Sequence, residues 1–573
     1  MFHGSKGRTT KESLKTIGSQ YQLPYCHAVQ RAWLVAVLCI LTPARALALE
    51  PWSDPRGDTP IQHRLGDYGL ELGAEYRSNW SYVNPIALNQ TRQRRASWIE
   101  HRLRLDSTVD YDEKVRLVIS MDALDGVIWG DNGTFASEPS SISGTRAAAT
   151  TPNVTRPGIG YQGQGDLTDP RSYGYVLVPA ETLVFRRAYG EVATPVGVLR
   201  IGRQPTAAGP TLLVDPGDGQ TNRFGFAGRG DSSDRFLFAT KPLEGLRAKG
   251  ERDLSPDRGL VAAVFYDRVV SDEVQLFGDD LHGGGIFLKW AHDDPARHQQ
   301  VELHGALAHR WETEFDTNVT VANARAVVRM HKLSVGAEVA HINGATREVS
   351  EAVALINSDP VVRQDVRQWG ARGVVRWDER TWTAYFEVDF ASGDRNPNPG
   401  SDLTQFYFAE DNNVGLLMFE RILHFESARS AAAGVELLRT IGAPSFPAER
   451  VDTEGSFTNA LAIFPQFDLR VVEDLLLRSG VLLAWAPSGL VDPIQSLDRR
   501  DGREVEDDLV NFNGGRPGTF YGVELDSRIQ WMYLDHFYLD LEGAIFFPGD
   551  VFHNKHGQAA RSVLLQGRTT FIF

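Results

Sequence analysis

The chain has 573 residues, of which 42% are hydrophobic and 10% aromatic, and its formal net charge is −15. This length exceeds that of an ordinary soluble domain, which has roughly 100–200 residues. The hydrophobic content is high enough to form a core and excludes intrinsic disorder. The acidic balance excludes a general nucleic-acid-binding protein. No apolar run in the body of the chain is long enough for a membrane-spanning helix.

Residues 1–48 have the features of a targeting segment. Basic residues precede the apolar run AWLVAVLCIL (Ala32–Leu41), and Ala46-Leu47-Ala48 offers a small-x-small cleavage site. The run is too short to cross a bilayer. We therefore predict a cleaved signal peptide with an extended basic n-region over 1–48, and one barrel domain over 49–573. An N-terminal anchor helix is the alternative.

Both cysteines, Cys26 and Cys39, fall within the predicted leader. The mature chain would then have no disulfide framework, thiolate metal site or cysteine nucleophile. The leader carries six of the 59 basic residues and one of the 74 acidic residues, so the mature charge is −20.

Apolar and polar residues alternate along WIEHRLRLDSTVDY (Trp98–Tyr111). Ile99, Leu103 and Leu105 share one face, and Arg102 and other charged residues share the opposite face. This period of two predicts a β-strand. In a membrane barrel the apolar face contacts lipid and the charged face lines the lumen. His101 falls on the apolar face, so we expect it near an interface or beside a β-bulge.

The same alternation recurs along the chain. Further examples are Gly69–Arg77, Val115–Asp122, Val321–Met330, Trp382–Phe390 and Tyr521–Tyr533. About 18 or 19 such segments occur, each near ten residues, which is the length a tilted strand needs to cross a bilayer. Because bacterial barrels have even strand numbers, we predict an all-β transmembrane antiparallel barrel of 18 strands, with 16 as the alternative.

Short and long connections alternate between these segments. Tyr111–Lys114 and Thr194–Gly197 are short turns, whereas Trp129–Ser172 and Pro205–Asp234 are long and rich in Gly, Ser, Thr and Pro. This alternation is typical of short periplasmic turns and long extracellular loops. The aromatic C-terminus, Phe573, resembles the assembly signal of bacterial outer-membrane barrels. It predicts the barrel assembly machinery as a partner and a location in the Gram-negative outer membrane.

Three segments resemble one family. They are Arg186–Gln204, a strand, turn and strand closing on Gly-Arg-Gln; Phe390–Asn398, an Ala-Ser-Gly-Asp strand end; and Tyr521–Asp550, a hairpin ending in Phe-Pro-Gly-Asp. They resemble the alginate-export type of outer-membrane porin. The resemblance implies an 18-stranded channel for anionic polysaccharide, with polysaccharide export and periplasmic export partners.

Charged residues on the predicted inner face form the candidate pore lining. They either set selectivity or form an ion-pair lattice that stiffens the wall. Arg102, Arg104, Arg200 and Arg325 are the candidates for binding an anionic solute, because guanidinium pairs bidentately with carboxylate. Arg203 alternates onto the lipid face. The predicted lining residues are Arg102, Arg104, Arg116, Arg187, Arg200, Arg325, Arg329, Arg372, Arg376, Arg528, Glu100, Asp106, Glu191, Glu387, Asp389, Glu524 and Asp526.

Two loop segments allow further predictions. Asp394, Asn396 and Asn398 place oxygen ligands at a spacing of two and form a candidate cation loop, which departs from the EF-hand pattern. The run Val414–Ala428 breaks the strand alternation. It is either an amphipathic helix folded into the lumen, where it would constrict the pore, or a strand with an external loop.

These features predict a channel, with no cofactor and no enzymatic activity, for passive diffusion or export of hydrophilic solutes such as anionic saccharides. Its expected partners are outer-membrane lipid, the solute and periplasmic export proteins, and no nucleic acid. One alternative is a structural or assembly barrel with a plugged lumen. The other is a membrane-embedded hydrolase, although the sequence contains no GxSxG, HExxH or Walker motif.

Overall fold

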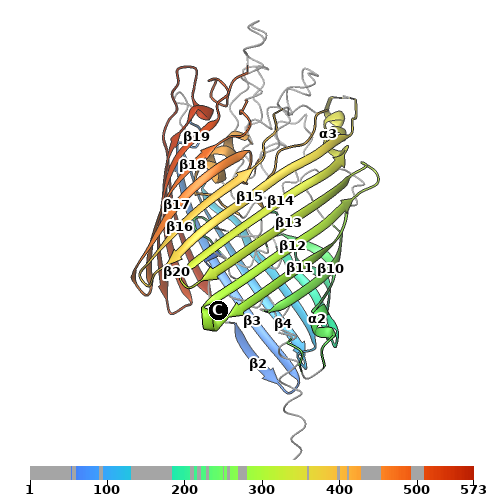
Figure 1. Ribbon diagram of the computed structural model, residues 1–573. Coiled ribbons are helices and arrows are strands. Elements are labelled where there is room, and N and C mark those ends of the chain that lie inside the picture. Colours follow the sequence, from blue (N-terminus) through green and yellow to red (C-terminus); the bar gives the residue numbers. More distant parts are fainter. Residues whose placement is uncertain are drawn as a thin grey trace, which may run out of the picture.

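The computed structural model describes residues 53–54, 60–88, 95–130, 183–206, 212–215, 221–226, 231–248, 251–253, 258–268, 281–357, 360–395, 400–409, 412–427, 453, 455–491 and 509–573 (Figure 1). The predicted leader, the proposed cleavage site and most of the loop Trp129–Ser172 lie outside these residues.

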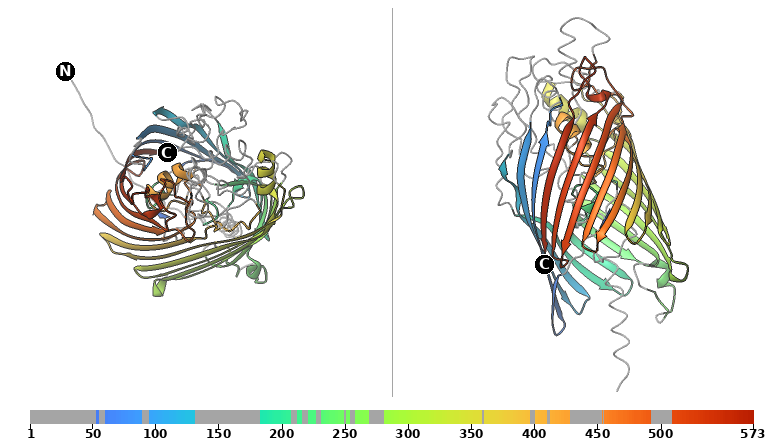
Figure 2. Two further views of the ribbon diagram at one scale, coloured as in Figure 1. Left: turned by 90° about the horizontal axis from the view of Figure 1, so that it is seen from above. Right: turned by 90° about the vertical axis from the view of Figure 1, so that its left-hand side faces the viewer.

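In the described part of the chain, eighteen strands close into an antiparallel barrel (Figures 1 and 2). The predicted all-β fold and the strand number are confirmed. The strands are β3 (Tyr68–Asn84), β4 (Ala96–Tyr111), β5 (Val115–Gly130), β6 (Val184–Thr194), β7 (Gly197–Pro205), β9 (Ser232–Thr240), β10 (Gly259–Arg268), β11 (His282–Asp294), β12 (Gln299–Trp311), β13 (Asn318–Met330), β14 (Leu333–Thr346), β15 (Gln364–Asp378), β16 (Trp382–Ala391), β17 (Ala460–Val472), β18 (Leu475–Trp485), β19 (Phe520–Tyr533), β20 (Phe537–Pro548) and β21 (Ser562–Ile572).

The barrel closes between its first and last strands. β21 pairs with β3 in a continuous register from Val563 opposite Asn84 to Ile572 opposite Glu75. Three shorter strands complete the fold. β2 (Ile61–Leu65) pairs with β3, and β1 (Ser53–Asp54) pairs with β8 (Thr221–Asn222) as a separate two-stranded sheet.

The connections alternate in length as the sequence predicts. Turns such as 112–114, 331–332 and 473–474 join strands at one end, where the C-terminus also lies, while the connection from β16 to β17 at the other end spans 392–459 (Figure 1). We therefore assign the turn end to the periplasm. At that end α2 (Pro242–Gly245) lies between β9 and β10, and the 3₁₀ turn η1 (Pro295–Arg297) lies between β11 and β12.

Helical segments described at the extracellular end include α3 (Glu348–Asn357) and the 3₁₀ turn η4 (Asp550–Phe552). Within the described ranges, no helix is long and apolar enough to cross a membrane.

The outer surface of the barrel is apolar. Side chains such as Leu117, Ile286 and Leu541 are about half exposed although they belong to long, paired strands. Apolar side chains in this position are suited to contact lipid rather than water. Near the periplasmic end, Trp531, Phe537 and Phe571 on β19 to β21 form an aromatic belt of the kind that marks the membrane interface.

His101 lies on this outer surface and packs edge-on against Tyr76, with ring centroids 6.2 Å apart. The pairing of β4 with β5 shifts register on both sides of His101. A β-bulge therefore does lie beside this residue, but His101 stays on the face that the alternation predicts.

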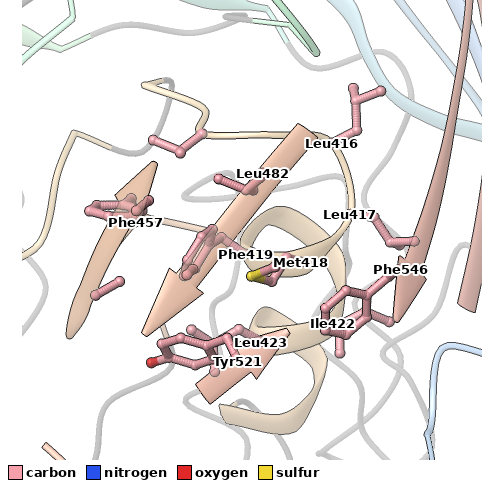
Figure 3. Packing of buried hydrophobic residues seen from close by; sticks show 14 of the residues in the cluster. Leu416, Leu417, Met418, Phe419, Ile422, Leu423, Phe457, Leu482, Tyr521 and Phe546 are labelled. Atoms are coloured by element: carbon pink, nitrogen blue, oxygen red, sulfur yellow. The ribbon is translucent and has the colours of Figure 1, made fainter. Parts of the chain in front are cut away.

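Two extracellular connections fold into the barrel. We call residues 221–226 the inner loop and residues 412–427, which contain the π-helix η2 (Met418–Leu423), the inner helix. Figure 3 shows Met418, Phe419 and Ile422 packing against side chains of the barrel wall, including Leu482 and Phe546. Of the two predictions for Val414–Ala428, the helix inside the barrel is the one observed (Figure 2).

Candidate functional site

The inner loop is held by charged residues on one wall of the barrel. The Arg223 guanidinium donates to Gln466 Oε1 at 2.7 Å and to Asp468 Oδ1 at 2.7 Å. Asp468 also accepts two hydrogen bonds from Arg478. The Arg223 carbonyl oxygen in turn accepts from Arg478 and Arg528, at 2.5 and 3.0 Å. Charge-assisted hydrogen bonds of this kind are stronger than neutral ones and fix the loop in place.

The end of the inner loop lies across the closure of the barrel. Gly225 donates its N–H to Glu542 on β20 and accepts from Arg568 on β21. The ring centroid of the next residue, Phe226, lies 3.2 Å from the guanidinium carbon of Arg77 on β3 and 5.0 Å from that of Arg568. These cation–π contacts are strong because the groups are desolvated.

The inner helix is anchored at its N-terminal end. The buried carboxylate of Glu524 accepts the backbone N–H groups of Leu416, Leu417 and Met418, at 2.5 to 2.8 Å. A carboxylate at this position satisfies amide groups that have no partner within the helix. Arg372 on β15 adds a hydrogen bond to Asn412, at 2.6 Å.

Several predicted lining residues therefore face the interior but contact the inner segments or one another. Arg372 pairs with Asp389 and Glu387, and Arg528 pairs with Asp540. Asp526 lies buried beside Glu524. Whether these residues line an open pore stays a prediction.

Strands β5 to β13 form another part of the barrel wall. In three of its ion pairs the base is more exposed than the acid: Arg186 and Asp122 are 15% and 0% exposed, Arg200 and Glu191 10% and 2%, and Lys289 and Glu302 19% and 8%. The pair Arg235–Asp267 is buried on both sides. In the first three pairs the cation is thus the more accessible partner.

The other predicted lining residues lie as follows. Arg102 pairs with Glu75, Arg104 makes two hydrogen bonds to Asp122, Arg376 pairs with Asp378, Arg329 bonds Ser334 and Glu100 bonds Asn79. In the strand register, Ser120 on β5 lies opposite Arg187 on β6 and, on its other side, opposite Asp106 on β4. Arg325 on β13 lies opposite Glu338 on β14. Among the described residues, no ion pair is formed by Arg116. Arg203 pairs with Asp234 and is about a third exposed, in agreement with its predicted outward face.

Sequence reasoning missed Lys289, His304 and the inner-loop residue Arg223. His304 bonds Glu302 and packs edge-on against Phe287. Lys289 and His304 belong to strands whose alternation is regular, so the same period of two identifies them. Arg223 lies in a long loop, where no periodicity indicates which way a side chain points.

The candidate cation loop gains no support. Asp394 is buried and accepts from Thr404 N at 3.4 Å, while Asn396 and Asn398 lie outside the described residues. Among the residues that the structure does describe, no group of three or more His, Cys, Asp or Glu side chains is arranged to hold a metal ion.

A closed barrel of eighteen antiparallel strands, apolar outside and charged inside, has the architecture of an outer-membrane β-barrel. No protein-family model and no curated protein matches the sequence. The fold is similar to solved structures of outer-membrane channels. One is OccAB1 of Acinetobacter baumannii, with 7% identity, 91% of this chain and 99% of that chain covered, and a TM-score of 0.45.

Two further similar structures come from Pseudomonas aeruginosa. OccK9 (OpdG) has 9% identity, covers 88% of this chain and 98% of its own, and gives a TM-score of 0.44. OccK2 (OpdF), solved in complex with glucuronate, has 8% identity, 90% and 99% coverage, and a TM-score of 0.42. At these identities the similarity concerns the fold alone. The more specific resemblance to the alginate-export family is not shown.

Proposed function

We propose that the protein is a passive outer-membrane channel for small hydrophilic solutes that prefers anions, with saccharide acids as the candidate class. The observation that carries this proposal is the arrangement of the β5–β13 wall, where in three ion pairs the base is more exposed than the acid. A wall whose accessible charges are positive attracts anions, because rings of charge set selectivity in pores. Lys289 and Arg116 are the residues on which we base the anion preference.

The test is single-channel recording of the refolded mature protein in a planar bilayer. The reversal potential across a salt gradient reports the sign of selectivity. We expect anion preference in the wild type and a shift toward cations in Arg116→Gln and Lys289→Gln, because each variant removes a positive charge from the inner wall. Arg297→Gln is the matched control, since this guanidinium is 79% exposed in a periplasmic turn rather than on the inner wall.

Oligouronate and a neutral oligosaccharide, added separately, test the solute class. Block of the current by the uronate alone, weakened in Lys289→Gln, supports a channel for saccharide acids. Steady conductance without ion preference would overturn the anion preference and leave a general porin.

A second candidate is a structural or assembly barrel with a plugged lumen. The inner helix favours it, because this segment packs against the wall through an extended buried apolar cluster. A correctly folded protein that carries no current in the bilayer would support this alternative. Variants that release the inner helix would then produce conductance.

A further inference from the structure

The β2–β3 hairpin projects from the periplasmic end of the barrel. Ala74 on β3 exchanges two backbone hydrogen bonds with the C-terminal Phe573, at 2.7 and 2.8 Å. Beyond that level β3 continues through Tyr68–Gly73, a length of about 20 Å at the usual rise per residue. Figures 1 and 2 show β2 and this part of β3 reaching below the C-terminus, beside the β4–β5 turn. The hairpin therefore extends past the aromatic belt into the periplasm.

One edge of β2 is open in the described part of the chain. β2 pairs with β3 alone, in a register from Ile61 opposite Leu72 to Leu65 opposite Tyr68. Hydrogen-bonded and non-hydrogen-bonded pairs alternate along an antiparallel ladder. The backbone of Ala74 bonds to Phe573, on the same side of β3 as β2. The backbone groups of the other even-numbered residues of β3 therefore point to β2, where they bond to the backbones of Ile61, His63 and Leu65.

The backbone N–H and C=O groups of Gln62 and Arg64 consequently point to the open edge. All five residues of β2 are exposed. Natural edge strands are usually protected by charges, prolines or bulges. The one charged side chain here, Arg64, turns instead toward Glu113 in the β4–β5 turn, at 2.7 Å. The preceding strand β1 pairs with β8 and does not cover this edge.

The surroundings of the edge indicate what would bind there. Ile61 and Leu65 are 65% and 76% exposed on one face of the hairpin and continue the apolar surface of Tyr68. On the other face, Arg64 pairs with Glu113 of the β4–β5 turn, and Lys114 pairs with Asp112 of the same turn. Further acidic residues, Asp67, Glu71 and Asp110, surround them, so the rim carries a net negative charge.

We propose that β2 is a docking strand for a periplasmic protein, which adds an extended segment to its open edge. The segment has apolar side chains at alternate positions, which cover Ile61 and Leu65, and basic residues at its ends, which complement the acidic rim. Main-chain hydrogen bonds to Gln62 and Arg64 provide affinity, and the side chains provide specificity, as in other cases of strand addition. This inference does not depend on the solute that the barrel conducts.

A synthetic peptide tests the proposal. The probe has about seven residues, alternating valine and threonine with lysine at both ends, and carries a fluorescent label. The full mature protein in lipid nanodiscs is titrated with it, and binding is followed by fluorescence anisotropy. We expect saturable binding, and none by the same peptide methylated on alternate backbone nitrogens, since methylation removes the donors that a strand needs.

Two variants at one position locate the site. Gln62→Pro removes an N–H that faces the open edge and keeps the bonds to β3, because proline is tolerated on an edge strand. It should weaken binding about tenfold, as expected for lost backbone hydrogen bonds. Gln62→Ala keeps the N–H and should bind like wild type. Unchanged channel current in Gln62→Pro shows that the barrel is intact.

Three outcomes would overturn the proposal. The first is no saturable binding by the probe. The second is equal binding to wild type and Gln62→Pro. The third is slow amide exchange at Gln62 and Arg64 without the peptide, which would mean that the edge is already covered by a second copy of the chain.

Discussion

The carboxylate of Glu524, on barrel strand β19, accepts the backbone N–H of Leu416 at 2.7 Å, although the two residues are 108 positions apart in the sequence. Through this contact and two neighbouring ones, one side chain of the wall orients the whole inner helix. Its role is thus structural, whereas the alternation alone indicates a lumen-facing acid.

Replacing Glu524 by glutamine should loosen the inner helix. The amide keeps one acceptor oxygen but directs an NH₂ group toward backbone donors, leaving buried N–H groups unsatisfied at a cost of about 1–3 kcal/mol. We expect a lower urea midpoint in micelles and more frequent conductance fluctuations in the bilayer. Asp526→Asn is the control, because neither Asp526 oxygen bonds the helix. Equal destabilisation in both variants would contradict the assigned role.

Asp468→Asn should release the inner loop. This carboxylate bonds the guanidinium groups of both Arg223 and Arg478, so the variant leaves two buried cations less well compensated. Removing one partner of a buried ion pair costs about 3–5 kcal/mol. We expect reduced stability together with a larger single-channel conductance. A loss of stability with unchanged conductance would show that the inner loop does not limit the current.

Arg104→Gln separates wall stability from ion selectivity. Arg104 is buried and doubly bonded to Asp122, whereas Lys289 is more accessible. We therefore expect Arg104→Gln to lower the unfolding free energy by up to about 3–5 kcal/mol and to leave the reversal potential close to that of wild type. Lys289→Gln should leave the unfolding free energy close to that of wild type and shift the reversal potential. A large selectivity change in Arg104→Gln would instead support the pore-lining role predicted from the sequence.

Two glycines on β15 give a matched pair for packing inside and outside the barrel. A Cβ at Gly370 would meet the Phe406 ring at 2.2 Å, while one at Gly373 would meet nothing within 4 Å. Gly370→Ala should destabilise the protein by about 1–3 kcal/mol, because the ring has to move. Gly373→Ala should be neutral within about 0.5 kcal/mol. Thermal unfolding of both variants in the same micelles provides the comparison.

Deleting Phe573 should affect assembly in cells more than folding in vitro. Its ring stacks with His536, and its backbone pairs with Ala74 at the barrel closure. We expect a lower folded fraction in the outer membrane of expressing cells, measured by heat-modified gel mobility, and a smaller change on refolding into lipid vesicles. Phe573→Tyr, which keeps an aromatic terminus, should assemble normally. Equal losses in cells and vesicles would assign Phe573 a purely structural role.

Most of the barrel follows from local pattern. Leu117 and Arg116 differ in direction simply because successive side chains of a strand point to opposite faces, so the sequence predicts both the strand and its lipid-facing side. Strand number and the alternation of turns and loops follow in the same way. The tilt and closure then require only that each strand pairs with the next.

The interior could not be predicted to the same degree. Gln466 and Arg223 are 243 residues apart and meet only because a long loop folds inward. No periodicity in the loop encodes that direction. Likewise, the exposure of Lys289 relative to Glu302 depends on the packing around them and not on strand alternation. The sequence thus identifies which charges face inward but not which of them are accessible.

The position of Phe226 has a consequence for how the barrel is made. Its ring contacts Arg77 on the first barrel strand and Arg568 on the last, so the inner loop bridges the seam from inside. These contacts can form only when both ends of the sheet have arrived, after the intervening strands have been synthesised. Docking of the inner loop on both strands therefore requires that β3 and β21 have come together. Any sideways opening of the seam in the mature protein would have to break at least one of the two cation–π contacts.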